Sequence, residues 1–342
     1  MEDRGIQVTK KRWLAIGIAL AIFVFSAGFS LMRAFVLKDS KETFSSLFFT
    51  ESDFYEEVIE EGNPLKKIVV LDVDGVIIDT GEDSFVGTAS YNHRSFMNKL
   101  EAIGKDPSVK GVVIRVNSPG GGTVESAEIH DKLKEMTEEK NIPVYISMGS
   151  IAASGGYYIS APATKIFASK ETITGSIGVI LQSYNIAELA DKLGIDANVI
   201  KSGPHKDIMS SMREMTDEER EILQEMIDNA YDDFVKIIAE GREMPESKVR
   251  ELADGRIFDG RQAKELGLID EFGYFKDTIA AIKEEQNLDD AYVVRYKDQA
   301  FTFGSLLWSS AKNLTGRDHS AEALLNLLTS SNAPRLMYLY SN

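Results

Sequence analysis

The feature that most constrains the fold of this chain is the alternation of short, apolar, β-branched runs with stretches of helical periodicity. Residues 66–78 (KKIVVLDVDGVII) and 111–118 (GVVIRVNS) predict buried strands, with a helical stretch near 91–104 between them. The pattern continues with strands at 143–149, 165–169, 173–181, 198–202 and 291–297, and with helices at 123–140, 185–193 and 216–242. Strands and helices that alternate in this way predict an α/β fold with helices on both faces of the sheet.

The longest of these helices has a clear start and a clear buried face. Thr216 is a suitable N-cap, and Glu219 three residues later completes a capping box. The apolar residues that follow recur at helical spacing, namely Ile222, Leu223, Met226, Ile227, Ala230, Phe234, Ile237 and Ile238. Residues 216–242 are therefore predicted to be one packed helix.

Charge and cysteine content exclude several classes of protein. The 38 Lys and Arg residues against 54 Asp and Glu residues give a net charge of −16. This charge repels a phosphate backbone, and no basic patch occurs outside the N-terminus, so we expect no nucleic-acid partner. The chain has no cysteine, which excludes disulfides, thiol nucleophiles and zinc or iron–sulfur sites built from Cys.

The N-terminal region predicts a membrane anchor. Residues 13–32 (WLAIGIALAIFVFSAGFSLM) carry no charge over a length that spans a hydrocarbon core. A cleaved signal peptide would have a shorter apolar region and a small-residue cleavage site. Because Lys10, Lys11 and Arg12 precede this run, the positive-inside rule places the N-terminus in the cytoplasm and the rest of the chain outside it.

The chain therefore divides into five expected parts. They are a cytoplasmic N-terminus (1–12), a single-pass transmembrane anchor in the cell membrane (13–36), an acidic linker (37–65), a catalytic domain (66–290) and a C-terminal extension (291–342). The linker is expected because residues 39–62 contain eight acids and only one lysine, which indicates an extended segment or a short helix.

The first candidate motif is LDVDGVIIDT at 71–80. It is similar to the opening motif of haloacid-dehalogenase-like phosphatases, in which Asp72 would be the nucleophile and Asp74 the general acid. That chemistry also needs an acidic magnesium-binding pair at a strand end, and the obvious pair, Asp232-Asp233, falls inside the long helix. We therefore expect Asp72 and Asp74 to lie on the exposed face of an edge strand.

Two glycine-rich segments carry the strongest catalytic signal. NSPGGG at 117–122 follows a strand and exposes backbone N–H groups that no side chain crowds, as an oxyanion hole requires. In GSIAASGGYY at 149–158, Ser154 precedes a helix start, where the helix dipole and the next N–H face a developing oxyanion. Close packing through small residues is the alternative explanation of the second segment.

A base for such a serine is available further along the chain. In IKSGPHKDIMS at 200–210, His205 and Lys206 are adjacent, and either type can activate a serine if the lysine is kept neutral. Ser176 in TGSIGV at 174–179 could orient a lysine amine, although a bulged strand explains this motif equally well. The other histidines, His93, His130 and His319, are interpreted as surface residues without a chemical partner.

In this order and spacing, NSPGGG, SIAASGGYY, TGSIGV and SGPHKDIMS resemble the signal peptide peptidase A (SppA) family of membrane-anchored bacterial serine peptidases. The resemblance covers about residues 66–275. It implies a fold like that of Clp protease and crotonase, a spiral of ββα units. It also implies a Ser154 nucleophile, a Lys206 base held by Ser176, and an oxyanion hole formed by the N–H groups of Gly121 and Gly155, with no metal and no cofactor.

The same resemblance implies how the protein works. Family members with a single copy of the domain form a ring, here a homo-octamer, in which Lys206 would reach Ser154 of a neighbour. The substrates would be apolar peptides, above all signal-peptide remnants that stay at the bacterial membrane after secretion. A catalytically silent membrane-anchored scaffold or peptide-binding ring is the alternative from another class, but both nucleophile and base are present.

The C-terminal residues 334–342 (PRLMYLYSN) form an apolar aromatic run. Such a run can simply pack on its own domain. Because it is similar to the expected substrates, it can also add as a strand to the binding groove of its own or a neighbouring subunit.

Overall fold

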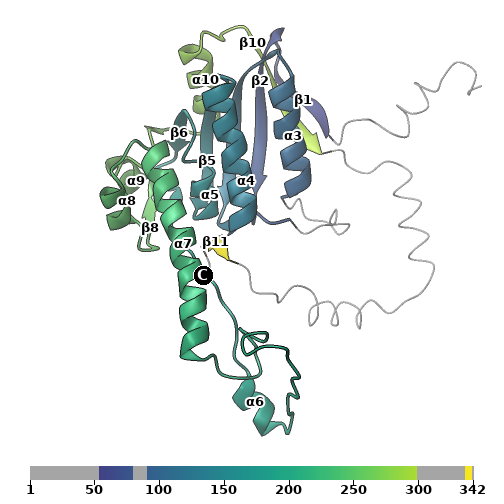
Figure 1. Cartoon of the computed structure of the whole chain (residues 1–342). Helices are drawn as coiled ribbons and strands as arrows, with labels where there is room; N and C mark the ends of the chain where they lie inside the picture. The colour runs from purple at the N-terminus through teal and green to yellow at the C-terminus, as the bar shows by residue number, and fades with distance from the viewer. Residues whose placement is uncertain (1–53, 80–90, 299–335, 341–342) are drawn as a thin grey trace, which may run out of the picture. The chain divides into compact units, whose positions relative to one another are not determined.

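The computed structural model describes residues 54–79, 91–298 and 336–340, and all of them belong to one compact unit (Figure 1). The expected anchor at 13–36 and the residues 1–12 and 37–53 on either side of it lie outside the described residues. Among the residues that the structure describes, no helix is both long and apolar enough to cross a bilayer.

A largely parallel sheet forms the centre of this unit. Its main path runs in the order β1-β10-β2-β3-β5-β6-β9, and only β1 joins it antiparallel. The bounds are β1 Phe54–Glu60, β2 Asn63–Asp74, β3 Val109–Ser118, β5 Val144–Ala153, β6 Lys165–Ala168, β9 Glu271–Phe272 and β10 Ala291–Asp298.

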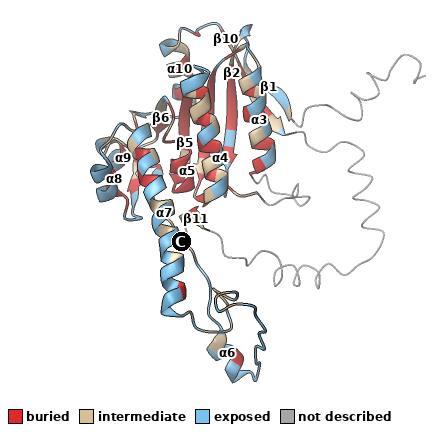
Figure 2. Ribbon diagram, in the orientation of Figure 1, coloured by how far each residue is buried: buried red, intermediate tan, exposed pale blue. Residues whose placement is uncertain are grey.

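Helices cover both faces of the sheet because the central strands are apolar on both sides (Figure 2). On β2, Val69 and Leu71 pack with residues of α3 and α4, whereas Ile68 and Val70 pack with α10 on the opposite face. The helices are α3 His93–Lys105, α4 Thr123–Lys134 with a π-helical turn η1 Glu135–Glu139, α5 Gly155–Tyr158, α8 Glu246–Leu252, α9 Gly260–Glu265 and α10 Phe275–Glu285. The expected α/β fold is confirmed.

Short strands adjoin the carboxyl ends of β3 and β5: two of them extend the main sheet, and two form a separate two-stranded sheet. β4 (Gly120–Gly122) pairs with β11 (Met337–Leu339), and β7 (Ile173–Gly175) pairs with β5 and with β8 (Ile257–Asp259). The succession β3, β4, α4 is a ββα unit of the kind that the sequence resemblance implies. Most residues of the candidate site lie on or next to these short strands.

An arm projects from the body of the unit (Figure 1). It consists of residues 181–216, with the short helix α6 (Ala187–Lys192), and of the first half of α7 (Asp217–Gly241). Between residues 181 and 215, all of which are described, Ala190 alone is buried. The second half of α7 buries Phe234, Val235 and Ile238 in the body, so the helix connects the arm to the core.

The capping box predicted for the long helix is present. Thr216 Oγ1 accepts a hydrogen bond from the Glu219 N–H at 3.2 Å, and the Glu219 carboxylate accepts one from the Thr216 N–H at 3.1 Å. The helix bounds agree with the prediction to within one residue.

Several expectations are corrected. The sheet includes Phe54–Glu60 and Ala291–Asp298, so the folded unit extends on both sides beyond the expected boundaries at 66 and 290. Residues 198–202 form no strand, because the arm gives them no neighbouring strand to pair with. β2 is a central strand rather than an edge, since β10 and β1 lie beyond it, although Asp72 and Asp74 are exposed as expected.

Candidate active site

Ser154 lies at the sharp turn where β5 ends and α5 begins. Its backbone has φ 53° and ψ −117°, a conformation that costs a non-glycine residue free energy and that recurs at catalytic turns. The side chain is 1% exposed. Its N–H donates to the Gly175 carbonyl at 2.8 Å, and its own carbonyl accepts from the Tyr157 and Tyr158 N–H groups. These bonds hold the serine in one orientation at the N-terminus of α5.

The glycine strand β4 lies directly against this turn. A side chain at Gly155 would come within 2.7 Å of Ser126 Oγ and 3.0 Å of the Gly121 nitrogen, and one at Gly120 within 2.7 Å of the Gly155 nitrogen. A side chain at Gly121 would meet the Ile77 carbonyl oxygen at 1.8 Å. The backbones of the two predicted oxyanion donors therefore pack together, and only glycine permits that distance.

The segment around Ile77 fixes the far edge of β4. The Ile77 N–H donates to the Gly120 carbonyl at 2.9 Å, and the Gly122 N–H donates to the Ile77 carbonyl at 2.8 Å. The other edge of β4 faces away from Ile77 and pairs with another strand. Ser176 lies on the opposite side of the turn, since Ala153 pairs with Gly175 across β5 and β7. The structure thus brings Ser154, Gly155, Gly121 and Ser176 together.

The chain's own C-terminus occupies this other edge of β4. β11 runs antiparallel to it, with Met337 opposite Gly122, Tyr338 opposite Gly121 and Leu339 opposite Gly120. On its other side Met337 exchanges two hydrogen bonds of 3.0 Å with Ile180. The tail thus adds as a strand to its own chain, and an extended peptide fits between β4 and residue 180.

The side chain of Tyr338 fills an aromatic pocket in this groove. Its ring stacks on Tyr158 with 4.8 Å between centroids and lies 4.7 Å from the ring of Phe234. Its hydroxyl donates to the Ala230 carbonyl of α7 at 3.1 Å, and the residue is 3% exposed. Burial raises the pKa of Tyr338 and of Tyr158, so both phenols stay protonated. The groove therefore accommodates a large aromatic residue at this position.

Lys206 is not part of this assembly of residues. It lies on the arm, exposed to solvent, and its backbone N–H donates to the Gly203 carbonyl at 3.3 Å. In the chain as described, no hydrogen bond or ion pair joins Lys206 to Ser154 or Ser176. One chain thus presents the serine and both amides but not the predicted base.

A cavity of about 570 Å³ opens beside Ser176 and the C-terminal strand. Its other walls are formed by backbone around Gly178 and by side chains of α7 and the turn before β8, including the carboxylates Asp228 and Asp254. Both carboxylates already have partners within the chain, since Asp254 pairs with Arg256 and Asp228 accepts a hydrogen bond from Gln224.

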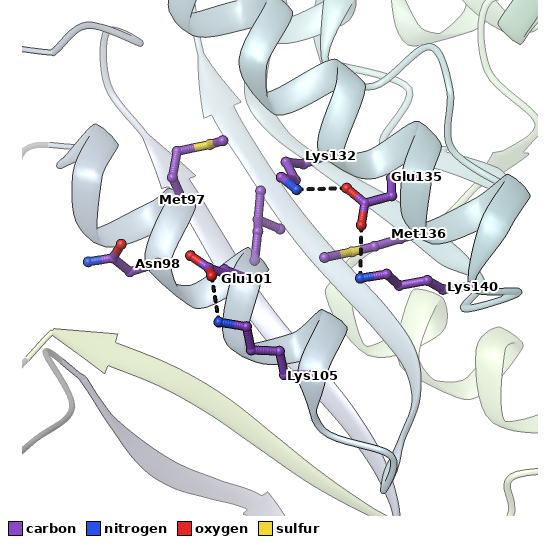
Figure 3. Close-up of a pocket in the computed structure, with 9 residues that line it drawn as sticks. Met97, Asn98, Glu101, Lys105, Lys132, Glu135, Met136 and Lys140 are labelled. Carbon is purple, nitrogen blue, oxygen red and sulfur yellow. Dashed lines mark hydrogen bonds and ion pairs between the residues drawn. The ribbon is translucent and has the colours of Figure 1, made fainter.

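A second cavity, of about 430 Å³, lies away from the predicted site residues, between α3 and the end of α4 (Figure 3). Its charged side chains pair with one another: Lys105 with Glu101, and both Lys132 and Lys140 with Glu135. The two lysines lower the pKa of Glu135 to about 2 through their hydrogen bonds. None of the predicted catalytic residues lines this cavity.

The structure corrects two interpretations of histidine residues. His93 is 5% exposed, and its ring nitrogens lie 2.7 Å from the Tyr91 hydroxyl and 2.7 Å from Glu128. His130 is also buried, against the ring of Tyr158 and within 3.0 Å of Asp131. Sequence alone could not reveal these partners, because all but the adjacent Asp131 depend on how the chain folds. His319 lies outside the described residues.

The arm also supplies His205 with carboxylate neighbours that the sequence did not reveal. Its Nε2 lies 3.6 Å from Glu218 and its Nδ1 lies 3.9 Å from Glu219. Glu219, however, already accepts hydrogen bonds from Arg213 and from the Thr216 N–H. It is therefore poorly placed to orient His205 as a general base.

The phosphatase motif has a structural explanation. Asp72 lies 3.3 Å from Arg295 Nε, and Asp74 accepts a hydrogen bond from Asn117 at 2.9 Å. Among the described residues no group of three or more His, Asp or Glu side chains could hold a metal ion. The arrangement does not fit phosphatase chemistry.

A buried serine at a strained turn, two adjacent glycine amides and a groove that holds an extended peptide together define a serine peptidase. Comparison with known proteins gives the family. The model of peptidase family S49 matches residues 136–289. A candidate signal peptide peptidase SppA of Enterococcus faecium is 42% identical over 97% of this chain and 99% of its own. Protease 4 of Haemophilus influenzae is 31% identical over 82% of this chain and 48% of its own.

The chain belongs to peptidase family S49 and is a serine peptidase. A solved structure, a ClpP1 mutant of Listeria monocytogenes, is 17% identical, with a TM-score of 0.40 over 63% of this chain and 95% of that one.

Proposed function

We propose that the protein is a membrane-anchored serine endopeptidase that degrades signal-peptide remnants and other apolar peptides through a Ser154–Lys206 dyad. The observation that carries this proposal is the C-terminal strand: an apolar, aromatic peptide lies extended in the groove beside Ser154, with Tyr338 in the aromatic pocket. The names of the relatives support the same substrate class.

The groove also suggests how a bond is presented. Tyr338 and Gly121 are opposed in the pairing, and the flanking pairs Thr123–Leu336 and Pro119–Tyr340 are hydrogen-bonded. Bonded pairs alternate in an antiparallel ladder, which directs the Gly121 N–H toward the Tyr338 carbonyl. That carbonyl oxygen and the Gly155 nitrogen both lie close to Gly120. A substrate carbonyl in this place would meet both proposed oxyanion donors.

The chemistry follows from these positions. Ser154 Oγ attacks the carbonyl carbon while the neutral Lys206 amine takes the hydroxyl proton, and the peptide C–N bond breaks as the protonated lysine gives this proton to the leaving nitrogen. A water molecule, deprotonated by the same lysine, then hydrolyses the ester and restores the serine. Ser176 would hold the lysine amine by a hydrogen bond.

The base would come from a neighbouring copy of the chain. The arm that carries Lys206 exposes several large apolar side chains, which a partner would cover; they are Tyr184, Ile186, Leu189, Leu193, Ile195, Val199 and Ile200. The cavity beside Ser176 would receive the lysine, whose amine Ser176 would hold. Repeated around a closed ring such as an octamer, this contact would complete every site.

The membrane part of the proposal rests on the uncharged run at 13–32 and the basic residues before it. An anchor at 13–36 would hold the peptidase unit at the outer face of the cell membrane, where apolar remnants collect.

Subunit mixing tests the proposal. Full-length Ser154→Ala and Lys206→Ala proteins should each be inactive toward an apolar fluorogenic peptide, and mixing them should restore activity at interfaces that combine both native residues. Turnover by the unmodified protein that is no faster than turnover by Ser154→Ala would overturn the enzymatic role of this site. It would favour the alternative of a peptide-binding scaffold. No recovery after proven exchange of subunits would place the dyad within one chain.

A further inference from the structure

The loop that carries Lys206 is held by one arginine. Arg213 donates to Asp207 through Nε at 3.0 Å and through a terminal nitrogen at 2.7 Å, so that it grips the carboxylate with two parallel bonds. It also donates to the Asp207 carbonyl at 3.1 Å. Asp207 directly follows Lys206 in the chain, so these bonds fix the backbone on which the lysine stands.

The same guanidinium is attached to the start of α7. Two of its nitrogens donate to the Glu219 carboxylate, at 2.8 and 2.5 Å. Glu219 is 1% exposed and is also half of the capping box with Thr216. The lysine loop is thereby tied to the first turn of a helix, a rigid element, rather than to the rest of the arm.

Lys201 completes the cluster from the other side of the loop. Its Nζ donates to Asp207 at 2.6 Å and to the Pro204 carbonyl at 2.8 Å. The two cations and two carboxylates of the cluster, Lys201, Arg213, Asp207 and Glu219, balance in charge. We call these four residues the arginine clamp.

Helix α7 connects this clamp to the peptide groove. The Ala230 carbonyl of α7 accepts a hydrogen bond from the Tyr338 hydroxyl, and Phe234 of α7 packs against the Tyr338 ring. Between residues 181 and 215, all described, only Ala190 is buried, so without the clamp the lysine would stand on an exposed loop.

We propose that Arg213 is a positioning residue for catalysis. It ties Asp207, the residue after Lys206, to the first turn of α7 and so holds Lys206 in the geometry in which the active site of a neighbouring subunit can use it. The inference rests on the proposed function, in which Lys206 is the base. Arginine is required because its planar fork makes two parallel bonds to one carboxylate and still reaches a second. A lysine keeps the charge but has neither the fork nor the reach.

The test places Arg213→Lys on one subunit of the mixed protein at a time. In this mixture the Ser154→Ala subunit contributes the native Lys206 to a shared site, and the Lys206→Ala subunit contributes the native Ser154. Arg213→Lys on the subunit that lends the lysine should lower the recovered kcat at least about tenfold with KM nearly unchanged, because a misplaced catalytic group slows the chemical step. The same change on the subunit that provides the serine should leave the recovered rate within about twofold.

Arg261 provides a matched control. It also bridges two carboxylates, Glu171 and Asp259, and Asp259 also belongs to a capping box, as the N-cap of α9. Arg261→Lys on either subunit should leave the recovered rate unchanged. If Arg213→Lys fails to fold, Asp207→Asn, which weakens the same bonds from the other side, takes its place.

Equal losses on both subunits would show that Arg213 only stabilises the fold, and no loss on either would show that the clamp is dispensable. Both results overturn the inference. If the mixture recovers nothing even without the Arg213 change, the intersubunit dyad fails separately. Arg213→Lys is then introduced into the otherwise unmodified protein, where a fall in kcat at constant KM supports the inference and an unchanged kcat overturns it.

Discussion

Tyr338 lies directly opposite Gly121, so the C-terminus of the chain occupies the place where a substrate would meet the predicted oxyanion hole. A strand in this position competes with every incoming peptide. Because it is part of the same chain, even weak binding is effective. The site as described is therefore occupied by its own tail.

Removing the tail should activate the enzyme toward small peptides. Deleting residues 334–342, or replacing Tyr338 with Ala, should raise kcat/KM several-fold, because the aromatic pocket and the edge of β4 become free. The melting temperature should fall slightly, since a buried aromatic side chain is lost. Tyr55→Ala, on the exposed edge strand β1, is the control. An unchanged rate would assign the tail a purely structural role.

Lys206 rather than His205 should be the base. Lys206→Ala should abolish turnover while the fold survives, whereas His205→Ala should keep at least about a tenth of it. The reason is that the carboxylates of Glu218 and Glu219 lie 3.6 and 3.9 Å from the ring nitrogens of His205, and Glu219 already accepts hydrogen bonds from Arg213. Steady-state kinetics of the purified variants decides between them. A dead His205→Ala protein of normal stability would replace the dyad with a Ser–His mechanism.

Gly155→Ala should lower kcat by about a hundredfold, as when an oxyanion donor is lost, because the added methyl group would displace the N–H groups of Gly155 and Gly121. The added methyl group would collide with Ser126 Oγ at 2.7 Å and crowd the Gly121 nitrogen at 3.0 Å. Combining it with Ser126→Ala removes the first contact but not the second. The double variant should therefore regain melting temperature without regaining turnover. Recovery of both would show that Gly155 serves packing alone.

The arginine clamp should weaken in acid. Hydrogen bonds from Arg213, and then from Thr216, lower the pKa of Glu219 to about 2, and those from Arg213 and Lys201 lower the pKa of Asp207. A carboxyl group whose pKa is lowered by folding stabilises the fold above its ordinary pKa of about 4, and this stabilisation is lost as the pH falls toward the lowered value.

Thermal unfolding of the wild type and of Arg213→Ala at several pH values measures this effect. The difference between their melting temperatures should be largest near neutrality and should shrink below about pH 4. A difference that does not change with pH would show that these carboxylates contribute no titratable stability.

The sequence predicted the regular elements of the body well, because β-branched runs and capping boxes act over short distances. The strands β2, β3, β5, β6 and β10, the long helix and the position of Ser154 at a helix start follow from such local patterns, whereas β1 lay in the expected acidic linker and β9 was not predicted. The prediction of a strand at 198–202 was wrong because a strand also needs a partner, and the arm provides none. The pairing of Phe54–Glu60 with β10 depends on residues more than two hundred positions apart, which no local pattern reveals.

The candidate site was predictable to the same extent. Glycines that permit close backbone approach were visible in the sequence, and so was the aromatic tail. The partners of Arg213 and of His93 were not, because the sequence does not show which of several nearby carboxylates and hydroxyls a side chain will contact.

Helix α7 has a further consequence. Eleven residues separate Ala230, at the aromatic pocket, from Glu219, at the arginine clamp, a span of about 16 Å along a straight helix. If Lys206 of each chain completes the site of the next, helix α7 contacts the peptide in the groove of its own chain. Through the arginine clamp, the same helix holds the loop whose lysine acts in the adjacent groove. We therefore expect neighbouring sites in a ring to act cooperatively, with a sigmoidal dependence of rate on peptide concentration that disappears when Tyr338 is removed together with the aromatic contact at Phe234.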